Sequence, residues 1–133
     1  MARAGLGDGW QCLFANDIDN KKGHAYIANW GASEFRLGDV HDLSAKDFPV
    51  QADLAWASFP CQDLSLAGNG VGLDGDHSGA FWGFYNVIHA LKSRRRAPKL
   101  LVLENVGGAV TSKDGRDFIE LCKALKTLGY VFG

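Results

Sequence analysis

A cysteine and a glutamate stand at positions from which they could carry out covalent chemistry together. Cys61 and the preceding Pro60 follow the apolar run 54–59, so the thiol is presented at the end of a buried strand and not inside the core. Glu104 ends the apolar run 100–103, where desolvation at the rim of a cleft can raise the pKa of a carboxyl group. A nucleophile and an acid on neighbouring strand ends suggest covalent catalysis with proton delivery.

Each of these residues also has a simpler interpretation. A single cysteine is more often a small buried hydrophobe, and a carboxylate after a strand is often a helix cap or a loop residue. Cys12 and Cys122 lie inside apolar periodic segments, so we expect both to be structural. A hydrolase triad would need a histidine as base. None of the four histidines follows a predicted strand, and no G-x-S-x-G or papain-like signature occurs.

Two aspartates stand where a nucleotide-binding sheet commonly receives its ligand. Asp17 follows the apolar run 12–15, and an acidic residue just past a strand of such a sheet commonly binds ribose hydroxyl groups. Asp39, in the sequence Gly38-Asp39-Val40, could accept a hydrogen bond from an adenine amino group. Exposed loop aspartates are common, so neither residue establishes a nucleotide site by itself.

The elements that must position these residues alternate between strand and helix. Short, continuously apolar runs are typical of strands buried on both faces of a parallel sheet, and they occupy residues 12–15, 54–59, 100–103 and 130–132. Apolar side chains at helical spacing predict helices over residues 18–30, 81–92 and 118–128. The pattern predicts an α/β fold with a mostly parallel sheet, flanking helices and right-handed crossovers. Ligands bind such sheets at the carboxyl ends of the strands.

Length and composition limit the possible classes of protein. The 133 residues fit one domain, and the hydrophobic share of 47% with a charged share of 22% is typical of globular proteins. No apolar run is long enough to cross a bilayer, and no signal peptide is evident. The three widely spaced cysteines suggest neither a disulfide framework nor a zinc site, which fits a reducing, cytoplasmic setting and predicts no metal.

Charge and loop composition leave two questions open. The net charge of −1 does not indicate a nucleic-acid binder. The basic stretch 92–96 could contact phosphates, or it could be a solvated helix end whose cations suit the helix dipole. Residues 66–78 are rich in glycine and aspartate and predict a long mobile loop, and loops of this length in compact domains are often lids or binding loops.

Five short motifs, in order along nearly the whole chain, resemble those of the DNA cytosine-5 methyltransferase family. The segment 58–62, Ser-Phe-Pro-Cys-Gln, resembles the catalytic Pro-Cys-Gln motif, and Glu104-Asn105-Val106, forty-three residues after Cys61, resembles the Glu-Asn-Val motif. The segments 16–19 and 38–40 resemble those that bind the ribose and adenine of S-adenosylmethionine. The segment 76–81 resembles the motif that begins the next helix.

The resemblance implies a Rossmann-like, S-adenosylmethionine-dependent methyltransferase fold and a defined reaction. Cys61 would attack C6 of a cytosine flipped out of DNA, Glu104 would contact N3 and supply a proton or hydrogen bond, and the methyl group would pass to C5. The other implied site residues are Pro60 and Asn105 for geometry, Gln62 and Ser65 near DNA, and Asp17, Ile18, Asp39, Val40 and Phe81 lining the cofactor pocket.

The sequence departs from the family pattern at both ends. The family opens with a strand that ends in Phe-x-Gly-x-Gly, but only ten residues separate Gly5 from Asn16, which leaves no room for the helix and strand that should intervene. We therefore expect residues 1–8 to be the end of that helix and the first strand to be absent. We expect the family's target-recognition domain and final helix to have no counterpart within residues 1–133. Residues 1–133 are thus expected to be one partial catalytic domain, inactive alone and completed by a missing C-terminal half or a complementary subunit.

Three alternatives remain open at this point. The first is an RNA-directed enzyme that methylates tRNA cytosine with similar motifs. The second is a non-catalytic remnant, or a subunit of a split methyltransferase, that binds nucleic acid or a partner. The third is an unrelated Rossmann-like nucleotide binder whose Pro-Cys-Gln turn is accidental. The resemblance implies a cytoplasmic, bacterial or phage-encoded enzyme, with restriction-modification, phage defence and regulation as candidate roles.

Overall fold

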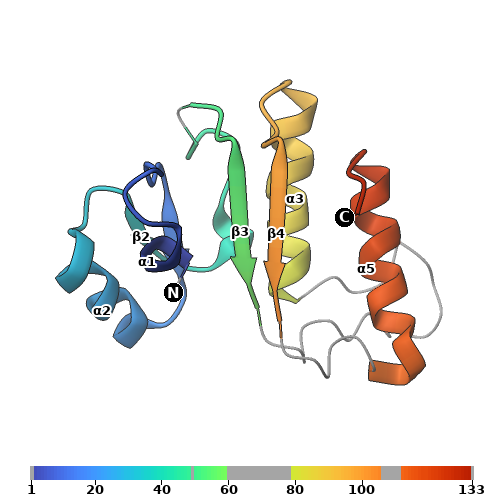
Figure 1. The fold of residues 1–133 in the computed structure, drawn as a ribbon, viewed down its shortest axis with the longest axis horizontal. Helices are drawn as coiled ribbons and strands as arrows, with labels where there is room; N and C mark the ends of the chain where they lie inside the picture. The colour runs from blue at the N-terminus through green and yellow to red at the C-terminus, as the bar shows by residue number, and fades with distance from the viewer. Residues whose placement is uncertain (1, 49, 60–78, 106–111, 133) are drawn as a thin grey trace.

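Strands alternate with helices along the chain, as the sequence predicted (Figure 1). The structure is a computed structural model that describes residues 2–48, 50–59, 79–105 and 112–132. The helices are α1 (Ala2–Leu6), α2 (Asn20–Trp30), α3 (Ala80–Ser93) and α5 (Arg116–Thr127), with the short 3₁₀ helices η1 (Val40–Asp42) and η3 (Ser112–Gly115). The strands are β1 (Ala15–Asp17), β2 (Phe35–Leu37), β3 (Leu54–Ser58) and β4 (Leu100–Glu104). No helix in these ranges is long and apolar enough to cross a membrane.

The described strands form two parallel pairs. β1 pairs with β2, which sets Asp17 opposite Leu37. β3 pairs with β4 over its whole length and ends with Ser58 opposite Glu104. Parallel strands with flanking helices confirm the predicted α/β class. We predicted one mostly parallel sheet, whereas the described residues form two separate pairs, because no ladder of hydrogen bonds joins β1 or β2 to β3.

The hydrophobic core lies between the β3–β4 pair and the helices α3 and α5 (Figure 1). Side chains alternate between the two faces of a strand, so one face of this pair packs against the helices. Its residues there are Ala55, Ala57, Leu101 and Leu103. α3 contributes Phe81 and Ile88, the largest fully buried side chains, and burial of each stabilises the fold by about 1.5–3 kcal/mol.

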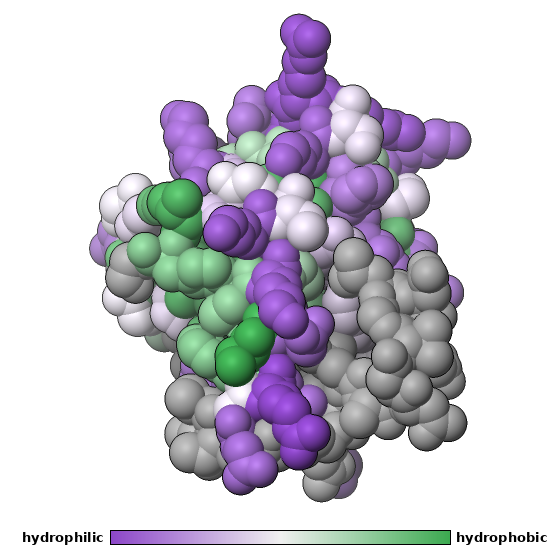
Figure 2. All heavy atoms as spheres, turned by 90° about the vertical axis from the view of Figure 1, so that its right-hand side faces the viewer, coloured by the Kyte–Doolittle hydropathy of each residue, from purple (hydrophilic) through white to green (hydrophobic). Residues whose placement is uncertain are grey.

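α5 has a buried face and a charged face. Leu121, Ala124 and Leu125 recur at helical spacing and are buried in the core. Figure 2 views the side of the molecule on which α5 lies, and hydrophilic side chains form a broad band there beside a hydrophobic area. Lys123 and Glu120 form an exposed ion pair on this helix.

The basic stretch at the end of α3 takes part in holding the fold together. Lys92 donates a hydrogen bond to the carbonyl of Leu128 at 2.6 Å, where the C-terminal end of α5 offers unpaired carbonyl groups. The guanidinium group of Arg96 donates to the carbonyl of Phe48. The sequence suggested phosphate contacts or a solvated helix end, and neither interpretation included these two contacts, in which Lys92 and Arg96 hold neighbouring segments together.

The strands differ from the prediction by more than one residue in three places. β1 starts at Ala15 and not at residue 12, because the ladder to the second strand begins where the N–H of Ala15 donates to the carbonyl of Glu34 at 2.8 Å. β2 was not predicted, since its three residues include Arg36 and make no apolar run. The predicted strand 130–132 is wrong: these residues form no strand, and Val131 is 93% exposed. The predicted helices are confirmed to within two residues at each end.

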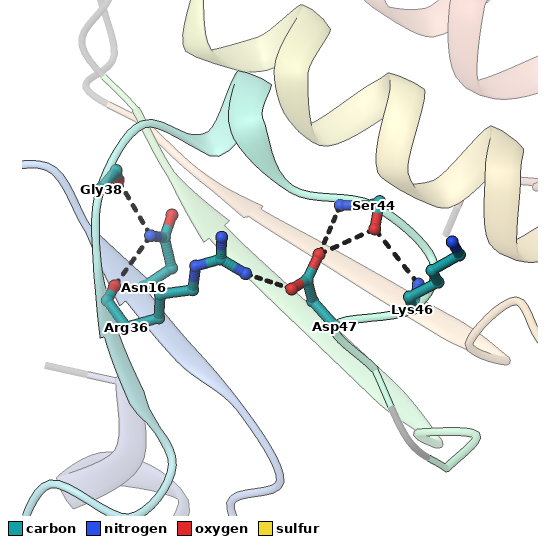
Figure 3. A network of polar contacts seen from close by, with 6 residues as sticks. All are labelled: Asn16, Arg36, Gly38, Ser44, Lys46 and Asp47. Carbon is teal, nitrogen blue, oxygen red and sulfur yellow. Dashed lines mark hydrogen bonds and ion pairs between the residues drawn. The ribbon is translucent and has the colours of Figure 1, made fainter.

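A polar network connects β2 to the segment that leads into β3 (Figure 3). The Asp47 carboxylate accepts hydrogen bonds from the N–H of Ser44 at 2.8 Å and from its hydroxyl group at 2.9 Å, and it forms an ion pair with Arg36 of β2. These donors, with the N–H of Ser44 first and Arg36 last, hold the pKa of Asp47 below its ordinary value. The network therefore ties the β1–β2 pair to the chain that enters the β3–β4 pair.

Gly83 allows α3 to approach η1 closely. A Cβ atom at this position would lie 2.5 Å from Cγ1 of Val40 and 3.2 Å from the backbone nitrogen of His41. The imidazole Nε2 of His41 also lies 3.2 Å from the carbonyl oxygen of Gly79, the residue that precedes α3. The segment that contains Asp39 is thereby held against the start of α3.

We expect Gly83→Ala to lower the free energy of unfolding by about 1 kcal/mol, measured by urea denaturation. Alanine improves helix propensity by about 1 kcal/mol, but overpacking against a β-branched side chain and a backbone atom costs about 1–3 kcal/mol, so the clash outweighs the gain. The loss should shrink in a Val40→Ala background. Gly5→Ala is the control, because a Cβ there meets nothing within 4 Å. Equal losses at Gly5 and Gly83 would contradict the close approach.

Asp47→Asn is expected to reduce stability at neutral pH and to have little effect in acid. A carboxyl group with a depressed folded-state pKa contributes stability above its unfolded pKa, and the contribution is lost as the pH falls through the folded value. Urea midpoints of both proteins should therefore differ at pH 7 and begin to converge as the pH falls below about 4. Asp8→Asn, an exposed aspartate outside the network, is the control. A difference between the midpoints that does not shrink as the pH falls below about 4 would rule out the electrostatic origin.

Candidate active site

The carboxyl ends of β3 and β4 lie side by side and are joined by side-chain as well as backbone contacts (Figure 1). The amide Nδ2 of Asn105, the residue after β4, donates a hydrogen bond to the carbonyl of Phe59, the residue after β3, at 3.0 Å. The Phe59 side chain is buried in the core, with its ring centroid 5.6 Å from that of Phe81. The chain is therefore anchored through both backbone and side chain just before Pro60.

Glu104 lies at the end of β4 on the face of the strand pair that points away from the core. Its neighbour Leu103 packs against the core, so alternation turns Glu104 to the other face. Oε2 of Glu104 accepts a hydrogen bond from the indole Nε1 of Trp56 at 3.1 Å. The sequence suggested a desolvated carboxyl group at the rim of a dry cleft, but the structure leaves Glu104 exposed, because this face of the strand pair is open to solvent at its carboxyl end.

The carboxyl ends of β1 and β2 bring two more predicted residues together. Asp17 ends β1, and its Oδ1 accepts a hydrogen bond from the N–H of Asp19 at 2.8 Å. Asp39 is the N-cap of η1, and its Oδ1 accepts from the N–H of His41 at 2.9 Å. The N–H of Gly38 donates to the carbonyl of Asp17 at 3.0 Å, so the two aspartates belong to adjacent strand ends.

The three apolar residues that were predicted to line the cofactor pocket differ in their exposure to solvent. Ile18 is 69% exposed next to Asp17, and Val40 is half-buried at the start of η1. Phe81 is fully buried, and its ring packs against those of Phe59 and Trp82. The structure thus leaves Ile18 accessible at this edge, whereas Phe81 lies in the core because it is on the face of α3 that covers the sheet.

Part of the predicted site lies outside the described residues. These residues are Pro60, Cys61, Gln62 and Ser65, and the predicted loop over residues 66–78 falls there too. Within the described ranges, no group of three or more histidine, cysteine, aspartate or glutamate side chains could hold a metal ion. The described part of the site therefore consists of Glu104 and Asn105 at one pair of strand ends and of the two aspartates, with Ile18 and Val40, at the other.

Sequence reasoning missed Trp56 and the structural use of Asn16. Trp56 lies in a continuous apolar run that predicts a buried side chain, and its hydrogen-bond partner is 48 residues away in sequence. Only the strand register brings them together. The amide of Asn16 donates to the carbonyls of Arg36 and Gly38, both at 2.9 Å, and so joins the ends of β1 and β2 (Figure 3).

An open hollow of about 300 Å³ lies at the opposite, amino ends of β1 and β2. It is lined by Leu13, Phe14, Ser33, Glu34, Phe35, Arg36 and Asp47. None of the predicted site residues lines it, and its charged residues are already engaged in ion pairs, Arg36 with Asp47 and Glu34 with Arg3. We therefore do not assign the site to this hollow, since ligands of parallel sheets bind at the carboxyl ends.

Asn105→Ala is expected to lower the free energy of unfolding by about 1 kcal/mol, because it leaves the carbonyl of Phe59 without its amide donor. The measurement is urea denaturation of the purified chain. Asn29→Ala is the matched control, since the amide of Asn29 also donates to a backbone carbonyl, that of Ala25 at 2.7 Å, but within an exposed helix. Its effect should stay within about 0.5 kcal/mol. Equal losses of unfolding free energy at the two positions would mean that the hydrogen bond between Asn105 and Phe59 contributes no more to stability than one within an exposed helix.

Residues 2–132 match the family of C-5 cytosine-specific DNA methylases. The type II methyltransferase M.NgoBI of Neisseria gonorrhoeae is 36% identical over 118 residues, which cover 89% of this chain and 35% of that protein. The type II methyltransferase M.HaeII of Haemophilus aegyptius is 35% identical over 122 residues, which cover 92% of this chain and 36% of that protein.

The crystal structure of the Dnmt2 methyltransferase from S. pombe has a similar fold. The TM-score is 0.64 at 27% sequence identity, and the match covers 88% of this chain and 34% of that chain. This chain therefore spans about a third of the length of the relatives that it matches. Because the family match extends over residues 2–132, the chain belongs to the family of C-5 cytosine-specific DNA methylases.

Proposed function

We propose that this chain takes part in the transfer of a methyl group from S-adenosylmethionine to C5 of cytosine in DNA, through a covalent bond between Cys61 and C6 of the base. The main support is the parallel pairing of Ser58 with Glu104. Ser58 is three residues before Cys61, so the nucleophile's segment and the carboxyl group leave the sheet at the same edge. Family membership supports the same reaction.

In the proposed reaction, the cytosine is first flipped out of the duplex, because its C5 and C6 cannot be reached inside the stack. The Cys61 thiolate then adds to C6, and the electron pair of the C5–C6 bond becomes available at C5. Glu104 supplies a proton or hydrogen bond at N3 and so stabilises the negative charge that the addition places on the ring. S-adenosylmethionine, when bound, supplies the methyl group. Loss of the C5 proton restores the double bond and expels the thiolate.

The residues around Cys61 would fix geometry and contact DNA. Asn105 holds the carbonyl of Phe59, which supports a positioning role for Asn105 and for Pro60 after it. Gln62 and Ser65 follow Cys61 in the motif that the family uses beside its substrate, and we propose that both contact DNA. These roles require that the segment after β3 stay close to the end of β4.

The carboxyl ends of β1 and β2 suit S-adenosylmethionine by their chemistry. The carboxylates of Asp17 and Asp39 can accept hydrogen bonds from ribose hydroxyl groups and from an adenine amino group. Ile18, 69% exposed, and Val40 offer apolar contacts to the same ligand. Phe81 is buried, so we propose that it supports this edge from the core and does not contact the cofactor.

The proposal treats residues 1–133 as one partial catalytic domain. The matched relatives are about three times as long as the region that this chain shares with them. We expect the corresponding parts of such an enzyme to supply sequence recognition and further cofactor contacts. Residues 1–133 assayed by themselves should therefore show little methyl transfer, and robust activity on duplex DNA would contradict this.

Cys61→Ser is expected to abolish covalent capture of DNA that carries 5-fluorocytosine. Fluorine at C5 cannot leave as a proton does, so an adduct that has received its methyl group persists and migrates as a larger species on a denaturing gel. The reaction contains S-adenosylmethionine and a polypeptide that supplies the remainder of a family catalytic domain.

Cys122→Ser is the matched control for this capture. Burial raises the pKa of the Cys122 thiol, which makes this cysteine a poor nucleophile, so the adduct should form normally. An adduct that survives Cys61→Ser, or that is lost equally in Cys122→Ser, would overturn the assignment of the nucleophile. Labelled tRNA in place of DNA tests the RNA-directed alternative, which stronger methylation of tRNA would favour.

A further inference from the structure

The side chains of Trp56 on β3 and Glu104 on the adjacent β4 contact each other on the face of the strand pair that points away from the core. The indole Nε1 of Trp56 donates a hydrogen bond to Oε2 of Glu104 at 3.1 Å. Trp56 is 39% exposed, so the ring is not simply a core residue whose N–H has found a nearby acceptor. Hydrogen bonds to charged acceptors are among the stronger ones that proteins make.

The strand register makes this contact a property of the sheet. Ser58 is directly opposite Glu104, and Trp56, two residues before Ser58, projects from the same face. A long aromatic side chain can span the diagonal between neighbouring strands. On the other face, Ala57 and Leu103 pack against the core and hold the two strands in this register. The donor and the acceptor therefore lie on the longer of the two described strand pairs.

We propose that Trp56 is a positioning residue for Glu104: its indole N–H holds one carboxylate oxygen and leaves the other for the base. An exposed glutamate side chain otherwise samples several rotamers, and fixing it during the reaction would add to the barrier. Asn105 anchors the backbone at the end of the strands, and Trp56 anchors the carboxylate. This role rests on the proposed function of Glu104, but the hydrogen bond itself can be tested without it.

The first experiment uses the indole N–H signals of the purified chain in ¹H–¹⁵N NMR spectra. The chain has four tryptophans, and the Trp56 signal is the one missing from Trp56→Phe. In Glu104→Ala this signal should shift, and its exchange with water should become roughly tenfold faster, because the acceptor is gone. Asp53→Ala is the control, since Asp53 lies at the other end of the strand pair and contacts Lys99. An unchanged Trp56 signal in Glu104→Ala would overturn the proposal.

The second experiment measures the rate of the 5-fluorocytosine adduct at saturating DNA. Trp56→Phe keeps an aromatic ring on the strand but removes the donor, and it should slow adduct formation roughly tenfold without changing the dissociation constant for DNA. In a Glu104→Ala background the same substitution should have no further effect, because a positioning residue acts only through the group that it positions. Trp10→Phe, at an exposed tryptophan before β1, should leave the rate unchanged.

The outcomes separate the two proposals. If Trp56→Phe slows the reaction equally with and without Glu104, Trp56 does not act through Glu104 and the inference is wrong. If the adduct forms normally in Trp56→Phe, the inference also fails while the proposed function stands. If no adduct forms, or if it survives Cys61→Ser, the proposed function fails, and the indole N–H signal still decides whether Trp56 holds Glu104.

Discussion

The parallel pairing of β3 with β4 is the constraint on which the candidate site depends. The pairing ends with Ser58 opposite Glu104, so two segments that are far apart in sequence leave the sheet at one edge. The side-chain amide of Asn105 then joins these two segments by donating a hydrogen bond to the carbonyl of Phe59. A shift of either strand by one residue would turn its own side chain, Trp56 of β3 or Glu104 of β4, toward the core, since strand side chains alternate between faces. Packing of the other face against α3 and α5 prevents that shift.

A second set of contacts decides where the aspartates lie relative to this edge. In the part of the chain that the structure describes, the β1–β2 pair shares no ladder with β3, so side-chain contacts fix its position. Arg36 pairs with Asp47 in the segment that enters β3, and Gly83 lets η1 lie close against α3. The first of these contacts is an ion pair, and the second depends on the absence of a single Cβ atom. The core, in contrast, is held together by many apolar contacts. The arrangement of the proposed cofactor residues is therefore expected to be more sensitive to single substitutions than the β3–β4 pair is.

Much of the fold could be predicted because its signals are local. The runs 54–59 and 100–103 are apolar and short, and the helical periodicity of residues 81–92 and 118–128 is regular, so these elements lie where we expected. β2 escaped prediction because a three-residue strand containing Arg36 has no pattern of its own and exists through its pairing with β1. The predicted strand 130–132 failed for the converse reason: an apolar run forms a strand only beside a partner, and no described strand lies next to it.

The sequence by itself determined the types of reactive residue, their order and the family, because motifs are read from neighbours along the chain. It also indicated that Asp17 and Glu104 follow strands. Only the tertiary structure decided that Phe81 is buried in the core, that Glu104 is exposed, and that Trp56 reaches it across two strands. Burial and hydrogen bonding between residues 48 positions apart depend on strand register and on which face of an element is covered, and neither is encoded in any short stretch of the chain.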